Sequence, residues 1–523
     1  MRCNRKVWTP ASKIRESRVN LVTWAPTRSR THAPPDLKLV KRHIVANRNG
    51  APTHRTKRRV VSPLNKWGRP VTILYLPSLR QPMAARSTQR QENLLATVWC
   101  FPMVDETEIV ITGIGVVSPI GIGKTPFWNS LQESRNGVMT IEAYDPSALP
   151  IRFGGEIQDF DPKAHVKPRK SLKVMCREIQ TGFSAGALAM TDAGLEHGSV
   201  EPDRLGVVFG SELFYTDPRD MRTVYAACTE NQEFDMDVWG SKGMHRLYPL
   251  WMLMYLPNMV ACHLGIAYDG RGHNNTITVG DVSSLHAVIE AAEILRRHDA
   301  DVMLAGGVGT RLNLTSTLYR STANLSHRND EPAAASRPFE RDRDGMVNGE
   351  GAGALVLETK SHAERRGATI YASIAGWNCS FEPVVPGQSF EGTGIGSSIH
   401  HSLRHAKLTA NDIGHINAQG NGTLYGDQVE ARVIQEQLGD TPVTAMKSFF
   451  GNLGTGSGAV ELAGAVLSIE QDIVPATRNY ANADPECPVH VIRDAPLHEK
   501  QNAAVVVSYS GTGQAASVIL RKP

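Results

Sequence analysis

The chain has 523 residues, of which 41% are apolar and 21% charged, a composition typical of a globular protein with room for two or three domains. Its net charge of +4 is the sum of a strongly basic part and an acidic part. Residues 1–102 contain 21 Lys and Arg against 3 Asp and Glu, whereas residues 103–523 contain 35 against 49. The composition therefore indicates two different kinds of polypeptide in one chain.

Residues 1–102 are rich in Arg, Pro and Thr and show no sustained helical or strand period. We expect this segment to lack compact structure or to lie outside the translated protein, because Met103 stands just before the first good strand. Two alternatives stay open. An Arg-rich, acid-poor leader is typical of a transit peptide, and runs such as Lys57-Arg58-Arg59 are typical of a basic arm that binds nucleic acid.

Short apolar runs predict buried strands along the rest of the chain, at residues 108–112, 206–210, 276–279, 301–305, 352–358 and 503–508. Between the third and fourth of these, a helix is expected after Asp281, since apolar residues recur every three or four positions from Leu285 to Leu295. A strand, a helix and a strand within about thirty residues predict a βαβ unit and hence a mostly parallel sheet with both faces covered. The fold class is α/β.

The longest apolar-rich stretch, residues 247–268, is interrupted by Pro249, Pro257, Asn258 and His263. A membrane helix needs about 20 clean apolar residues, so we interpret this stretch as buried loop and helix and expect no membrane span. The seven cysteines form no CxxC pair, which fits a reducing compartment and argues against a zinc site; they are Cys3, Cys100, Cys176, Cys228, Cys262, Cys379 and Cys487. We expect a cytoplasmic protein, or an organellar one if residues 1–102 are a transit peptide.

Five segments in order resemble the β-ketoacyl-acyl-carrier-protein synthase family. They are residues 109–121 (IVITGIGVVSPIG), 256–265 (LPNMVACHLG), 337–358 (RPFERDRDGMVNGEGAGALVLE), 417–431 (NAQGNGTLYGDQVEA) and 447–461 (KSFFGNLGTGSGAVE). The resemblance implies the thiolase fold, five-layered α-β-α-β-α with two similar halves, which we place at residues 103–360 and 361–523. It also implies a dimer with the active site near its interface. No residues suggest a metal, nucleotide or flavin site, so we expect no cofactor and no metal.

The family's catalytic cysteine sits at a strand-to-helix turn, and the resemblance places Asp281 at that position. A thiol at a helix N-terminus has a lowered pKa and attacks thioesters as the thiolate. A carboxylate there is also stabilised but is a poor nucleophile toward thioesters. We interpret Asp281 as an ordinary N-cap that accepts hydrogen bonds from the first turn, in preference to a covalent or acid/base role.

The positions of the two catalytic histidines are occupied by Gln419 and Asn452. In the family these histidines polarise the malonyl thioester and stabilise the enolate formed on decarboxylation. Amides can donate hydrogen bonds, but they cannot become cationic or shuttle a proton. Replacement of all three catalytic positions together therefore points to lost condensation chemistry.

The resemblance also maps supporting residues. Lys447 stands at the family's active-site lysine, and Asp427, Glu430 and Glu461 match acidic positions around it. They either line a pocket as a residual charge network or hold loops together structurally. Tyr509 and Gly511 occupy the places of a gatekeeper and an oxyanion-hole donor that contact substrate. His286 is interpreted as structural and Cys262 as a residue of a packing helix.

Three functions remain open. The first is a non-catalytic homologue, a pseudoenzyme like the chain-length factors of polyketide synthesis, which pair with an active cysteine-containing synthase. The second is an active 3-oxoacyl-carrier-protein synthase, an acyltransferase of fatty-acid or polyketide synthesis, or a malonyl decarboxylase with an altered site. The third is an acyl-binding scaffold. The expected partners are an acyl carrier protein and a second synthase-like subunit, as homodimer or heterodimer, and neither a nucleic acid nor a membrane.

Because the sequence predicts that the folded core begins between about Glu106 and Val110, removal of residues 1–102 should leave stability unchanged. A chain that starts at Met103 should unfold at the same urea concentration as the full chain, within error. A lower midpoint for the shortened chain, measured by circular dichroism, would contradict this interpretation of the segment.

Overall fold

The computed structural model describes residues 107–385 and 389–523. The predicted leader, residues 1–102, lies outside the described residues. Within them, the helix after Asp281 and a strand at each predicted place are present, but the strand expected at residues 276–279 runs from Asn274 to Ile277 and is exposed to half-buried. No helix in the described ranges is long and apolar enough to cross a membrane.

Two halves of the chain form five strands each with the same order and the same pairing. In both halves the first two pairs are parallel and the next two antiparallel. The N-terminal half has the order β8 (Asn274–Ile277), β5 (Leu205–Gly210), β9 (Val302–Thr310), β10 (Glu350–Thr359), β1 (Ile109–Ser118). The C-terminal half has the order β13 (Val443–Thr444), β12 (His415–Asn417), β16 (Ala503–Tyr509), β17 (Gln514–Arg521), β11 (Ala372–Phe381). Three residue pairs between β1 and β11 join the halves.

The prediction of a mostly parallel sheet was wrong, because the βαβ unit accounts only for β5, β8 and β9. After β9 the chain returns to the same end of the sheet, and Glu350 at the start of β10 pairs with Thr310 at the end of β9. A connection that returns to the same end produces an antiparallel pair. The sheet is therefore mixed.

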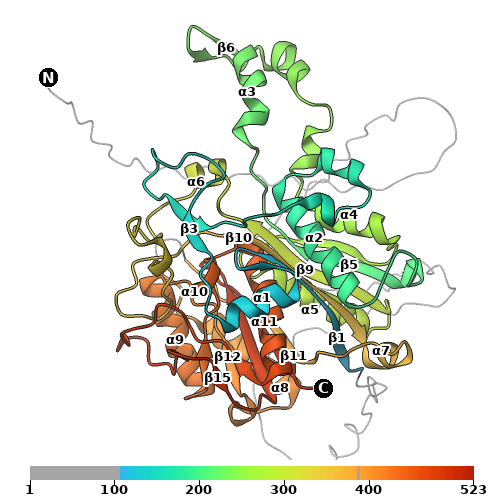
Figure 1. Ribbon diagram of the computed structural model, residues 1–523, viewed down its shortest axis with the longest axis vertical. Helices are drawn as coiled ribbons and strands as arrows, with labels where there is room; N and C mark the ends of the chain where they lie inside the picture. The colour runs from blue at the N-terminus through green and yellow to red at the C-terminus, as the bar shows by residue number, and fades with distance from the viewer. Residues whose placement is uncertain (1–106, 386–388) are drawn as a thin grey trace, which may run out of the picture. The chain divides into compact units, whose positions relative to one another are not determined.

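Helices cover both faces of each half (Figure 1). Alternate residues of β10 show the division: Leu355 and Leu357 belong to an inner core, and Ala354 and Val356 to an outer one. The inner core contains α5 (Ser283–Arg296) and α11 (Ser457–Gln471); the outer cores contain α2 (Arg177–Asp192) and α4 (Met259–Tyr268) on one side, and α8 (Thr393–Ala406) and α9 (Leu424–Leu438) on the other. This is the five-layered α-β-α-β-α arrangement with two similar halves, and it explains why the strands are continuous apolar runs.

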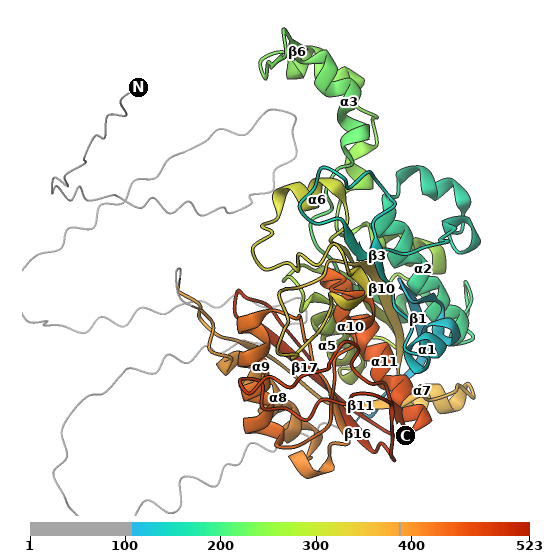
Figure 2. The same cartoon turned by 60° about the vertical axis from the view of Figure 1, so that its left-hand side comes forward.

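The other helices and strands are short. They are α1 (Lys124–Gln132), α3 (Pro218–Ala227), α6 (Leu314–Tyr319), α7 (Lys360–Arg365), α10 (Lys447–Phe450), β2 (Gly121–Ile122), β3 (Val138–Thr140), β4 (Phe153–Gly155), β6 (Thr229–Glu230), β7 (Glu233–Phe234), β14 (Ile473–Val474) and β15 (Leu497–His498). Between β5 and α4, residues 213–254 form an arm that contains α3, β6 and β7. In both views α3 and β6 stand away from the layers (Figures 1 and 2).

The prediction that residues 247–268 are buried was wrong for the part that belongs to the arm, residues 247–254. In α4, Val260, Ala261 and Leu264 are fully buried as predicted, whereas Ile266 is 71% exposed. On the arm, Leu250 is 45% exposed and Met252 is 62% exposed. Nine of the large apolar side chains exposed in the described chain lie on this one segment: Leu213, Tyr225, Phe234, Met236, Met244, Tyr248, Leu250, Met252 and Leu253. Such a concentration is typical of a surface that is covered by a partner.

Candidate active site

Asp281 lies in the turn between β8 and α5. Gly280 makes the turn with a φ of 71°, and α5 begins at Ser283. The interpretation of Asp281 as an N-cap was wrong: Val282 is the N-cap residue, and no side chain caps the helix. The hydroxyl of Ser283 closes the turn instead, accepting from Val279 N at 2.9 Å and donating to Gly280 O at 2.6 Å.

The carboxylate of Asp281 pairs with the guanidinium of Arg311, the residue that directly follows β9. The two side chains are only 15% and 11% exposed. Asn452 Nδ2 donates to the second oxygen of Asp281 at 3.0 Å. Burial opposes ionisation of Asp281, but Arg311 and Asn452 outweigh it and hold the pKa of the carboxyl below its usual value. Asp281 is therefore an anion held from two sides.

A row of alternating charges continues from this pair. Arg320 donates to Glu212 Oε2 at 2.7 Å, and Glu212 stands two residues after β5. Burial raises the pKa of Glu212, although Arg311 and Arg320 counteract it. Sequence reasoning missed Arg311, Glu212 and Arg320. A signal was available, since the parallel strands β5 and β9 are each followed by a charged residue, and the carboxyl ends of parallel strands meet at one edge of the sheet.

The side-chain amide of Gln419 forms hydrogen bonds to other groups of the protein. Its Nε2 donates to Tyr509 O at 2.8 Å, and its Oε1 accepts from Tyr509 N at 2.5 Å and from Ser508 Oγ at 2.9 Å. The amide thus pairs with the backbone at the end of β16, as a neighbouring strand would. Ser508 Oγ also lies 3.2 Å from Asp281 O, so one hydroxyl links Gln419 and Asp281.

The side-chain amide of Asn452 is likewise engaged in hydrogen bonds within the protein. Besides Asp281, its Nδ2 donates to Asn421 Oδ1 at 2.9 Å, and its Oδ1 accepts from Gly454 N at 2.7 Å. Asn452 is 1% exposed, and so is Gln419. Neither amide can turn to donate a hydrogen bond to a charge that develops on a substrate, because this reorientation would leave buried groups of the protein unpaired.

Lys447 connects this group to a cluster of buried carboxylates. Its Nζ donates to Gln419 O at 2.8 Å and to Glu461 Oε1 at 2.5 Å. Burial raises the pKa of Glu461, while Lys447 opposes the rise. The structure therefore brings Asp281, Gln419, Asn452 and Lys447 together through direct contacts and the hydroxyl of Ser508.

Glu430 and Asp427, one turn apart on α9, hold the surrounding loops. Glu430 accepts from the backbone N–H groups of Gln419 at 2.7 Å and Gly420 at 2.9 Å, and Asp427 accepts from those of Phe339 at 2.8 Å and Gly422 at 3.1 Å. Burial raises the pKa of Glu430 to about 8, with a further contribution from Asp427, and raises the pKa of Asp427 to about 6. These contacts are those of a structural cluster.

The two residues mapped to substrate contacts differ in exposure. Tyr509 is 4% exposed; its hydroxyl donates to Gly426 O at 3.2 Å and its ring lies 5.5 Å from that of Phe390. Gly511 is exposed in the loop between β16 and β17. His286 lies on α5, where burial lowers its pKa, and Cys262 lies on α4 in the outer layer.

The pair between Asp281 and Arg311 should stabilise the fold as a unit. Asp281→Ala leaves Arg311 buried without its main partner and should lower the free energy of unfolding by about 3 kcal/mol. Asp281→Ala combined with Arg311→Leu should cost less than the sum of the two single changes, because the second change removes the stranded charge. Urea unfolding of the four proteins measures this coupling, and purely additive costs would show that the pair is not a unit.

Stability should also depend on pH through Glu430. Its pKa of about 8 in the folded state exceeds the ordinary value of 4.5, so between these values the folded protein binds more protons than the unfolded chain. The free energy of unfolding should then fall as pH rises from about 5 to 8, by up to about 1.4 kcal/mol per pH unit from this group. Glu430→Gln should flatten this slope in urea unfolding, whereas Glu436→Gln, at an exposed position on the same helix, should keep it. Equal slopes in all three proteins would contradict the assignment.

Comparison with known proteins identifies the family to which the chain belongs. Residues 106–363 match the profile of the N-terminal domain of β-ketoacyl synthases, and residues 371–481 match that of the C-terminal domain. The chain is 31% identical over 428 residues to 3-oxoacyl-[acyl-carrier-protein] synthase 2 of Vibrio harveyi, covering 80% of this chain and 99% of the relative. It is also 31% identical over 427 residues to the ketoacyl synthase alpha subunit of the tetracenomycin polyketide synthase of Streptomyces glaucescens, covering 80% and 98%.

Among solved structures, a β-ketoacyl synthase from Burkholderia phymatum superposes with a TM-score of 0.72 at 28% identity, covering 80% of this chain and all of that one. The two domain profiles, the relatives and the shared thiolase fold agree with the resemblance found in the five sequence segments. This chain belongs to the β-ketoacyl synthase family.

Proposed function

We propose that this protein is a non-catalytic β-ketoacyl synthase homologue that acts like a chain-length factor, as the partner of an active, cysteine-containing synthase. The observation that carries the proposal is the ion pair between Asp281 and Arg311 at the nucleophile position. A carboxylate neutralised by a buried guanidinium is a weaker nucleophile than a free one. It is held in place by Asn452 as well.

The rest of the site supports the same conclusion. Condensation needs groups that stabilise an enolate and handle protons, and these normally act as a unit with the nucleophile. At the two histidine positions stand Gln419 and Asn452, amides whose donors and acceptors are already paired within the protein. The side chains beside Asp281 are charged, namely Arg311 and then Glu212 and Arg320, which is an unfavourable lining for an acyl chain.

Two surfaces favour a synthase-like partner. β8 ends the strand order, and among the described strands it pairs only with β5, so its outer edge is available for pairing with another chain. The arm of residues 213–254 carries the exposed apolar side chains described above. An edge strand and an apolar arm together suit a second subunit of similar fold. An acyl carrier protein is proposed as the further partner, because the relative from Vibrio harveyi is named as a synthase that acts on it.

Intact-mass spectrometry tests the proposal. The full chain, incubated with acyl- and malonyl-carrier protein, should acquire no acyl group and form no ketoacyl product, since no thiol occupies position 281. Product should form when a cysteine-containing homologue is added, and the two proteins should co-elute in size-exclusion chromatography. A ketoacyl product, or an acyl group mapped to Asp281, from the lone protein would overturn the proposal.

Two variants sharpen this test. Asp281→Cys places a thiol beside Arg311, which should lower the pKa of that thiol and permit slow acylation. Condensation should still fail, because Gln419 and Asn452 cannot move protons. Asp281→Ala is the matched control, since any acyl group that it acquires must lie on another residue such as Cys262.

A further inference from the structure

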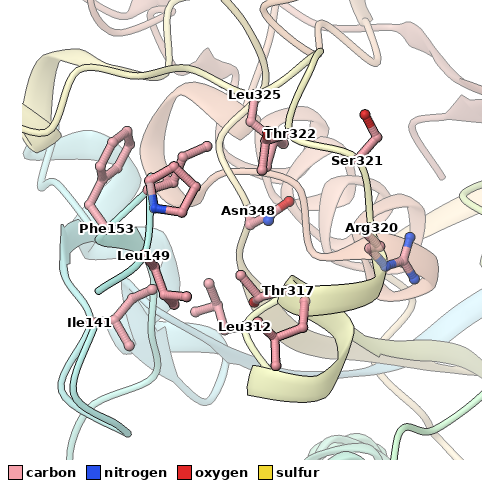
Figure 3. A pocket seen from close by; sticks show the side chains of 13 residues that line it. Ile141, Leu149, Phe153, Leu312, Thr317, Arg320, Ser321, Thr322, Leu325 and Asn348 are labelled. Atoms are coloured by element: carbon pink, nitrogen blue, oxygen red, sulfur yellow. The ribbon is translucent and has the colours of Figure 1, made fainter. Parts of the chain in front are cut away.

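Two hollows of the described chain differ in whether they present an unpaired charge. Among the residues that line the cavity beside the row of charges, Arg320 alone is charged (Figure 3), and its guanidinium donates to Glu212 Oε2 at 2.7 Å. An open groove of about 640 Å³ lies elsewhere, between α5, β11 and α8. Arg404 of α8 lines this groove, and its guanidinium forms no hydrogen bond or ion pair within the described residues. The groove therefore presents a cation that is available to a ligand.

The negative charge of the groove is already engaged. Glu293 is the one carboxylate among the lining residues; its Oε1 accepts from Trp377 Nε1 at 3.0 Å and its Oε2 from Arg296 Nη2 at 2.6 Å. Because Glu293 and Arg296 neutralise each other, Arg404 leaves the groove with a net positive charge. Cys379 adds no negative charge, since desolvation and the nearby Glu293 raise the pKa of its thiol to about 11.

The other unpaired polar side chains of the groove are able to donate hydrogen bonds. Asn378 Oδ1 accepts from Ser380 Oγ at 2.8 Å, while its Nδ2 has no partner within the described residues. His405 Nδ1 lies 3.3 Å from Trp377 N; when it accepts this hydrogen bond, the ring proton is on Nε2, which is unpaired as well. His401, one turn earlier on α8, has an exposed imidazole without a hydrogen bond in the described chain. Such donors around one cation complement an anion with several acceptor oxygens.

The backbone of β11 adds a further donor. β1 pairs with β11 only as far as Ile374, so the later part of this edge has no described strand beside it and borders the groove. N–H groups two residues apart in a strand point to the same side. Cys379 N therefore points away from β17, as Trp377 N does toward His405. Backbone N–H groups of this kind bind oxyanions well.

The groove is larger than an inorganic anion. A water molecule occupies about 30 Å³ in the liquid, so a groove of about 640 Å³ has room for roughly twenty non-hydrogen atoms, and inorganic phosphate would fill only a small part of it. The ligand that suits both the donors and the volume carries a phosphoryl group on an organic body.

We propose that this groove binds a small organic phosphomonoester, with its phosphoryl group at Arg404 and Asn378. Arginine binds phosphate through paired N–H···O bonds, and the terminal oxygens that remain suit the neutral donors of β11 and α8. The site shares no residue with Asp281 or its partners, so it does not depend on the proposed function.

Phosphorus NMR titrations of the full chain at physiological salt test the proposal with ribose 5-phosphate and inorganic phosphate. Ribose 5-phosphate should bind at least tenfold more tightly than inorganic phosphate, and Arg404→Gln should weaken its binding at least tenfold. Arg222→Gln, the same change at an exposed arginine of α3 that also lacks an ion pair in the described chain, should leave the affinity unchanged. This control also accounts for the many cations of residues 1–102, which every variant retains.

Two further variants separate a built site from diffuse attraction and from misfolding. Asn378→Ala removes one neutral donor without changing the charge and should weaken ribose 5-phosphate at least threefold. Glu293→Gln still accepts from Trp377 Nε1 but no longer neutralises Arg296, so it should tighten binding at least threefold, a gain that a misfolded protein would not show. Affinity that Arg404→Gln or Asn378→Ala leaves unchanged, that Glu293→Gln fails to raise, or that is equal for inorganic phosphate would overturn the proposal.

Discussion

The ion pair between Asp281 and Arg311 is the interaction on which the geometry of this site depends. An anion at a position that is largely hidden from water persists only if a cation and hydrogen-bond donors accompany it. Arg311 arrives from the end of β9, and Asn452 from the loop before α11. Glu212 and Arg320 then extend the alternation of charge away from the turn. Removing one member would leave its neighbour uncompensated, so the four charged side chains and the turn hold one another in place.

The buried carboxylates of the C-terminal half serve a different purpose. Glu430 and Asp427 each accept hydrogen bonds from two backbone N–H groups of loops that have no regular secondary structure, and Lys447 fixes the carbonyl of Gln419. Loops rich in glycine lose much conformational freedom on folding, and side-chain acceptors offset that cost. The loops therefore need Asp427, Glu430, Lys447 and Glu461 whether or not chemistry occurs at the site.

Both halves contribute to the site, which explains why it lies in the middle layer. The N-terminal half supplies Asp281 before α5 and Arg311 after β9, and the C-terminal half supplies Gln419, Asn452 and the end of β16. The shared core of α5 and α11 keeps the two halves in register.

Local patterns in the sequence determined most of the buried strands and the helix that follows Asp281, whereas the assignment of Asp281, Gln419 and Asn452 to catalytic positions rested on the family resemblance. The five motif segments, which span both halves, determined the layered fold as well. Tertiary structure alone decided how those residues are used. Arg311 lies 30 residues after Asp281, and Tyr509 lies 90 residues after Gln419, so no local period reports either contact. The same holds for the antiparallel pair of β9 and β10, and for the arm at Leu250 and Met252, whose apolar residues predicted burial. Hydrophobic periodicity reports which residues avoid water in a local element, whereas the partner of a buried charge depends on which strand ends the fold brings together.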